Sequence, residues 1–159
     1  MDADKYHRLL AKVLNETCYP FYVVHPDLNY RCSCNNSVTK QADPKCKKCL
    51  GTGYKIRIRQ IEGFAYDELK GGNMLGVEKS QVIKNYFIKR TFNLYEGDYI
   101  FDNEQIYYVF RVMNLKGLHG YHTHQEVICS RKNNDREVIY NNFKDILKHY
   151  YALHKKKGD

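Results

Sequence analysis

The chain has 159 residues with six cysteines and no tryptophan, and its 26 lysines and arginines outnumber 18 acidic residues, which gives a net charge of +8. This length fits a single domain over residues 1–159, and the basic charge predicts acidic partners such as nucleic acid. Residues 1–13 lack the apolar stretch of a signal peptide, and no segment approaches the roughly 20 apolar residues that span a bilayer, so we expect a soluble, unsecreted protein with no membrane partner.

An amphipathic helix is predicted over residues 2–16. Apolar side chains at positions 6, 9, 10, 13 and 14 recur at the i, i+3, i+4 spacing that places them on one side of a helix. Asp2 or Asp4 is placed to cap the first turn. We expect the apolar side of this helix to pack against a core or a partner.

Four of the six cysteines lie within residues 31–49, in the sequence RCSCNNSVTKQADPKCKKC. Two short cysteine pairs separated by a loop can supply four thiolates to a tetrahedral zinc ion. Because four protein ligands leave no position for water or substrate, the predicted zinc is structural and not catalytic. We therefore predict a zinc-binding insert over residues 30–54, with free thiols and disulfides as the alternatives. The predicted ligands are Cys32, Cys34, Cys46 and Cys49.

The residues that follow the cysteines predict a basic strand and then a long loop. Tyr54, Ile56 and Ile58 alternate with cations, a period of two that separates the two faces of a strand. The stretch 62–81 has four glycines and no sustained periodicity, which indicates a long glycine-rich loop with a functional role. Cations in this region are candidates for contact with DNA, although a charged strand face is more often only solvated. The DNA-facing candidates are Lys55, Arg57, Arg59, Lys70 and Lys79.

Three further segments complete a β-rich middle. Residues 98–113 predict a hairpin with a tight turn at residues 102–104. Residues 82–92 and 122–130 predict two more strands, which brings the total to four or five antiparallel strands. The first of these two segments carries a further cluster of cations for which phosphate contact and simple solvation are both open. These cations are Lys84, Lys89 and Arg90.

Histidines and the two remaining cysteines give weaker signals. A metal site at His119, His122 and His124 is one interpretation, and solvated or interface histidines are the favoured one, because no carboxylate or cysteine stands at fixed spacing beside them. For Cys18 and Cys129 the favoured interpretation is that each is a small buried hydrophobic residue.

The C-terminal residues 135–157 predict a second helix, with a cap at Asp135 and lysines at its end. The predicted fold class is therefore mainly β, a small antiparallel barrel or sandwich, with N- and C-terminal helices and a zinc-ribbon insert.

The order YRCSC…CKKCLGTGYKIRI, followed by a glycine-rich stretch and LYEGDYIFDNEQIYYVFRV, resembles neck proteins of tailed bacteriophages. These are the head-completion, stopper or head–tail connector proteins between portal and tail, and the resemblance covers residues 30–115. It implies a small β-barrel that assembles with copies of itself as a ring around the DNA channel, with the loop 62–81 projecting inward to gate it. It also implies portal or adaptor and tail proteins as partners, non-specific contact with packaged DNA, and a place in the virion neck after assembly in the host cytoplasm.

The residues themselves favour an assembly or binding protein over an enzyme. The sequence has no nucleophile motif, no phosphate loop and no patterned pair of carboxylates. We therefore expect a non-enzymatic structural virion protein of the phage neck, with a structural zinc. One alternative is a zinc-ribbon nucleic-acid-binding protein, in which the cysteine module and the cationic strand make the contacts. Another is metal-assisted hydrolysis through the histidine tract.

Overall fold

The structure, a computed structural model, describes residues 3–70, 82–89, 91–103, 105–116 and 122–131. The chain divides into two compact units. The first contains the described residues up to Val24 and from Ile58 onward, and the described part of the second is His25–Arg57. The sequence predicts one domain with an insert at residues 30–54, so the second unit begins earlier and ends later than that insert.

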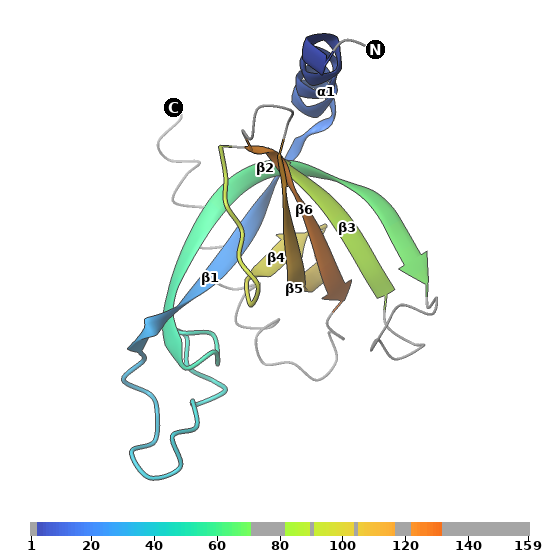
Figure 1. Ribbon diagram of the computed structural model, residues 1–159. Coiled ribbons are helices and arrows are strands. Elements are labelled where there is room, and N and C mark those ends of the chain that lie inside the picture. The colour runs from blue at the N-terminus through green and yellow to red at the C-terminus, as the bar shows by residue number, and fades with distance from the viewer. Residues whose placement is uncertain (1–2, 71–81, 90, 104, 117–121, 132–159) are drawn as a thin grey trace, which may run out of the picture. The chain divides into compact units, whose positions relative to one another are not determined.

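Six antiparallel strands form the sheet, in the order β1-β2-β3-β6-β5-β4, and the sheet closes into a barrel (Figure 1). Closure gives each of the six described strands a neighbour on both sides. The prediction of a mainly β fold is confirmed, and of the two predicted forms the chain adopts the barrel. The strands are β1 (Tyr19–Arg31), β2 (Tyr54–Lys70), β3 (Val82–Lys89), β4 (Tyr99–Asp102), β5 (Gln105–Lys116) and β6 (His122–Arg131).

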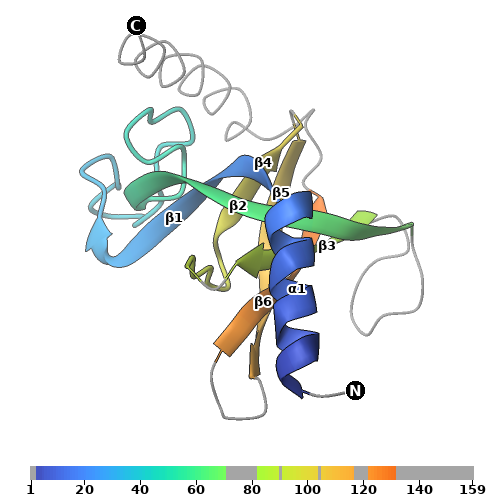
Figure 2. The same cartoon turned by 90° about the horizontal axis from the view of Figure 1, so that it is seen from above.

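Helix α1 (Ala3–Thr17) leads directly into β1, as Figures 1 and 2 show. It covers the segment in which a helix is predicted. Leu14 is buried, whereas Leu9 and Val13 of the same apolar stripe remain 54% and 40% exposed. The predicted C-terminal helix at residues 135–157 lies outside the described residues. Among the described residues, no helix has the length and apolar character needed to cross a membrane.

Strand β1 is absent from the sequence prediction, although its residues Phe21 and Val23 belong to the core. Pro20 and Pro26 obscure the strand pattern, because proline cannot donate a hydrogen bond to a sheet. The core of the first unit collects inward-facing side chains from all six strands and from the segment between β3 and β4. Its buried members are Phe21, Val23, Ile61, Tyr86, Ile88, Leu94, Ile100, Tyr107, Val109, Val127 and Cys129.

Strand β2 continues through residues that the sequence assigns to a loop. The predicted loop at 62–81 is wrong in its first part, because Gly63 to Lys70 pair with β3 from Ile88 to Val82. Its first inward positions hold the small residues Gly63 and Ala65, which give no apolar alternation to recognise. A side chain at Gly63 would place its Cβ only 2.5 Å from the Phe87 carbonyl oxygen, so glycine is required there. Residues 71–81 lie outside the described residues.

The predicted hairpin is confirmed. Strand β4 pairs with β5 from Tyr99↔Tyr108 to Asp102↔Gln105, which leaves a two-residue turn. Asn103 in that turn has a φ of 47°, a left-handed conformation that asparagine tolerates well.

A polar cluster inside the barrel was not predicted. The Oδ2 atom of Asp102 accepts hydrogen bonds from the Tyr19 hydroxyl at 2.8 Å and the Tyr86 hydroxyl at 2.9 Å. The Lys84 ammonium lies 2.8 Å from the same oxygen, and its side chain is only 13% exposed. The expectation of a surface cation cluster at Lys84, Lys89 and Arg90 is therefore wrong for Lys84. Lys89 forms an ion pair with Glu62, and Arg90 lies outside the described residues.

Candidate metal centre

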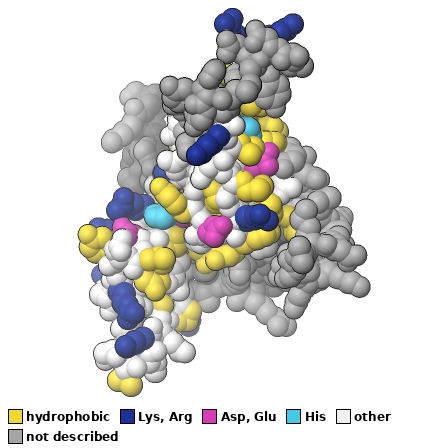
Figure 3. All heavy atoms as spheres, in the orientation of Figure 1, with side chains coloured by type: hydrophobic (Ala, Val, Ile, Leu, Met, Phe, Trp, Pro, Cys, Tyr) yellow, Lys and Arg dark blue, Asp and Glu magenta, His cyan; other side chains and the backbone are white. Residues whose placement is uncertain are grey.

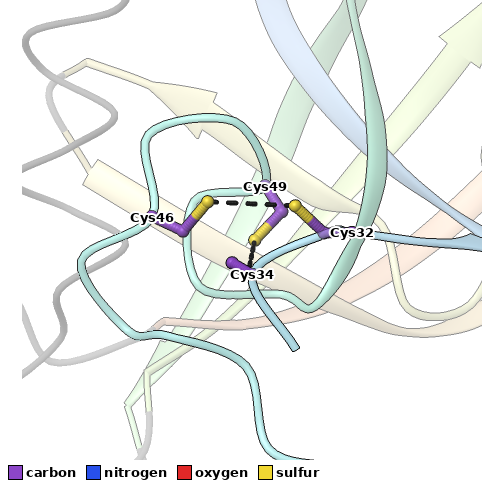
Figure 4. A group of neighbouring side chains, drawn as sticks. All are labelled: Cys32, Cys34, Cys46 and Cys49. Carbon is purple, nitrogen blue, oxygen red and sulfur yellow. Dashed lines mark hydrogen bonds between the residues drawn. The ribbon is translucent and has the colours of Figure 1, made fainter. Parts of the chain in front are cut away.

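The four predicted ligands come together in one loop of the second unit, between the end of β1 and the start of β2 (Figure 4). Cys32 follows the last residue of β1 directly, and Cys34 lies one residue further on. Cys46 and Cys49 occupy the returning half of the loop, before β2 begins at Tyr54. The sequence prediction of which cysteines cluster agrees with this arrangement.

The sulfur atoms are spaced for a metal ion and not for disulfides. The Sγ atoms of Cys32 and Cys46 are 3.8 Å apart, and those of Cys34 and Cys49 are 3.5 Å apart. All four lie within 4.8 Å of one another. A tetrahedral zinc with Zn–S bonds of about 2.3 Å separates its sulfur ligands by about 3.8 Å, whereas a disulfide bond measures about 2.05 Å. The four thiols therefore fit one tetrahedral ion.

Backbone hydrogen bonds close the loop at its base. The carbonyl oxygen of Gly53 accepts from the backbone N–H of Cys32 at 2.9 Å and from the side-chain amide of Asn35 at 3.0 Å. These bonds join the outgoing half of the loop to the returning half. The separation of the two cysteine pairs is thus set by the backbone as well as by any metal.

The returning half turns sharply through left-handed residues. Leu50, Gly51 and Gly53 have φ values of 54°, 79° and 79°. A Cβ at Gly51 would lie 3.2 Å from the Pro44 carbonyl oxygen, so this glycine serves both the φ angle and the close approach. The turn brings backbone N–H groups toward the sulfurs, the usual means by which a metal site orients its thiolates.

The thiols differ in proton affinity because their surroundings differ. Burial raises the pKa of the Cys34 thiol to about 12, and hydrogen bonds with the neighbouring thiols add to the increase. Burial also opposes ionisation of Cys46, but backbone hydrogen bonds from Cys49 and Lys48, together with hydrogen bonds from the neighbouring thiols, lower the pKa to about 7. A bound cation favours the thiolate form of every ligand, so metal binding would release protons.

The four sulfur donors determine which metal ions this centre can bind. Such a set suits zinc or another thiophilic ion, and it leaves no open coordination position once a tetrahedral metal is bound. The structure shows a cluster that could hold a metal ion, at the positions expected from the sequence.

The DNA-facing candidates fall in different environments. Lys55 is exposed and lies 5.8 Å from the centre of the Tyr30 ring. Arg57 forms a 2.9 Å ion pair with Asp27 while its side chain stays 68% exposed. Arg59, in the first unit, is half-buried and donates a hydrogen bond to the Asn93 carbonyl. Lys70 is the last residue of β2, and Lys79 lies outside the described residues.

Of the three histidines in the tract, the structure describes the side chain of His124. His124 is buried, 7% exposed, and not solvated. Its ring contacts Phe87 with centroids 5.1 Å apart, and its Nε2 atom lies 3.9 Å from a Glu126 carboxylate oxygen. His119 and the side chain of His122 fall outside what the structure describes. Of the two remaining cysteines, Cys129 is buried as predicted, and Cys18 is half-buried.

Sequence reasoning missed Asp27 and Tyr30, because no strand was expected at residues 19–31. Tyr30 is 59% exposed beside Lys55, and Asp27 is buried beside Arg57. The basic strand predicted from Tyr54 onward implies a neighbouring strand with complementary side chains. This implication could have led to Asp27 and Tyr30. Comparisons with models of known protein families and with curated proteins found no match to this chain.

Proposed function

We propose that the chain is a structural protein of the neck of a tailed bacteriophage, where it joins the head and portal to the tail in a ring of identical copies. The proposal rests on one combination of features. The residues that resemble neck proteins, 30–115, contribute four of the six strands of a closed antiparallel barrel, β2 to β5, and a loop with four clustered thiols. A small barrel of this kind is what the resemblance implies.

We propose further that the four thiols hold one structural zinc. A loop of this length has little apolar material to bury, with Cys49 and Leu50 among its few buried side chains. A metal cross-link supplies the stability that a small segment lacks. In a neck, this would keep the loop in one shape as DNA passes.

The closed barrel restricts how copies could join. Each described strand already has two neighbours in the sheet, so we expect copies to join through side-chain surfaces and not through added strands. Leu9 and Val13, exposed on one side of α1, are suited to such a contact. In the proposed ring a neighbouring copy or the portal covers them.

Sedimentation with and without a candidate portal protein tests this proposal. We expect wild type to join the portal in a ring-sized complex, and the double variant Leu9→Asp/Val13→Asp to stay a folded single chain. The double variant Lys5→Asp/Lys12→Asp, on the same helix, is the matched control, because it introduces two aspartates outside the apolar stripe. A wild-type chain that remains a monomer with every portal tried would contradict the proposal.

A further inference from the structure

The positive charge of the protein is concentrated in the described residues of the second unit. His25–Arg57 contains seven lysines and arginines and two acidic residues, a net charge of +5 out of +8 for the chain. In Figure 3, dark blue side chains recur over the part of the surface at the lower left that carries the cysteine loop. The cations are Arg31, Lys40, Lys45, Lys47, Lys48, Lys55 and Arg57.

All seven cations are exposed to solvent. Within the described part of this unit, Arg57 is the one that forms an ion pair, with Asp27. The other acidic side chain, Asp43, accepts a hydrogen bond from the backbone N–H of Lys45 at 2.9 Å and so serves to shape the loop. The other six cations have no ion pair among the described residues, so they are open to an external anion.

The cysteine cluster fixes where several of these cations stand. Lys47 and Lys48 lie between Cys46 and Cys49, and Lys45 precedes the first of that pair. A metal bound by the thiols would hold these three lysines in one turn. Ordering them before binding lowers the entropy that a partner must otherwise remove.

Strand residues extend the same basic surface. Lys55 lies over the exposed ring of Tyr30, and Arg31 is next to Tyr30 in sequence. Among the described residues of this unit, the exposed large apolar side chains are Leu28, Tyr30 and Val38, which are outnumbered by the seven exposed cations. Repeated exposed cations fit a phosphate backbone, whose closely spaced negative charges several lysines and arginines can contact at once.

We propose that His25–Arg57 is a binding site for the phosphate backbone of double-stranded nucleic acid, and that the metal-bound loop presents its lysines. This inference rests on the proposed function in one respect, the metal bound by the four thiols, and it does not require assembly into a ring. The main contacts are then the loop lysines together with the strand cations. Such backbone contacts carry no sequence information, and their affinity falls steeply with salt.

The test measures binding of a mixed-sequence DNA duplex to the full-length, metal-loaded chain by fluorescence anisotropy at several salt concentrations. We expect a Kd on the order of 10⁻⁵ M near physiological salt, without sequence preference. Lys47→Gln/Lys48→Gln should weaken binding about tenfold and reduce the salt slope by about two. The matched control Lys12→Gln/Lys116→Gln removes the same charge from exposed positions of the other unit and should change binding less than about twofold.

Equal losses in the two double variants would overturn the proposal, because net charge alone would then explain the binding. So would binding of acidic protein or anionic vesicles in the absence of duplex binding. Metal removal by a chelator gives an independent readout. Reprotonated thiols make the segment more positive by two charges than its zinc-thiolate form, so simple attraction predicts tighter binding, whereas an ordered loop predicts weaker binding. We expect weaker binding, and tighter binding would contradict the role given to the metal.

Discussion

Among single residues, the pair of Lys84 and Asp102 inside the barrel carries the largest expected effect on stability. Lys84→Met leaves the Asp102 carboxylate without its cation, while Tyr19 and Tyr86 still donate hydrogen bonds. Removal of one partner from a buried ion pair costs about 3–5 kcal/mol, and the remaining hydrogen bonds place the expected loss near the lower figure. Urea unfolding measures the loss.

Lys89→Met is the matched control for Lys84→Met. It removes the same ammonium group from the same strand, but its partner Glu62 is 48% exposed, so the loss of unfolding free energy should stay below about 1 kcal/mol. Similar losses of unfolding free energy in the two variants would show that the buried ion pair stabilises the fold no more than the exposed one.

His124 predicts how stability responds to acid. Burial lowers the pKa of its imidazole from 6.5, and the nearby Glu126 carboxylate opposes that effect only in part. The unfolded chain therefore binds a proton more readily than the folded chain, and the free energy of unfolding falls as pH drops below 6.5. The variant His124→Gln should lose this part of the pH dependence in urea unfolding. An identical dependence in the two proteins would contradict the assignment.

Single residues also show which features a sequence pattern is sufficient to predict. The spacing of Cys32, Cys34, Cys46 and Cys49 identified the cluster, because ligand geometry demands thiols at short intervals. The strand pattern could not predict the burial of Lys84, because the sequence pattern is the same whether the lysine side chain faces solvent or the barrel interior. Its partner Asp102 lies 18 residues away, and only the fold brings the two together.

At the scale of elements, the cysteine loop should melt separately from the barrel. Cys46→Ser removes one thiolate, so bound metal should fall and amide hydrogen exchange should rise across residues 32–53. Exchange in core strands such as β5 and β6 should remain slow, because their pairing does not involve the loop. Cys18→Ser, which changes a cysteine outside the cluster, should leave both metal content and loop exchange unchanged.

Uniform exchange across the chain after Cys46→Ser would instead show that loop and barrel unfold together.

The elements themselves were predictable from the sequence to different degrees. The hairpin of β4 and β5 followed from a tight turn between apolar strands, whereas β1 was hidden by Pro20 and Pro26, and the second half of β2 by small inward residues such as Gly63. Strand propensity is a property of single residues and disfavours glycine. The barrel nevertheless requires small residues where its strands approach closely, as at Gly63.

For the whole molecule, we propose a closed barrel with one metal per chain that assembles into a ring. Native mass spectrometry of freshly purified protein, alone and with a candidate portal, measures metal content and the number of copies in the same spectrum. We expect one zinc for each chain and, with the portal, a complex that contains many copies. A metal-free chain that stays a monomer in the presence of the portal would contradict this proposal.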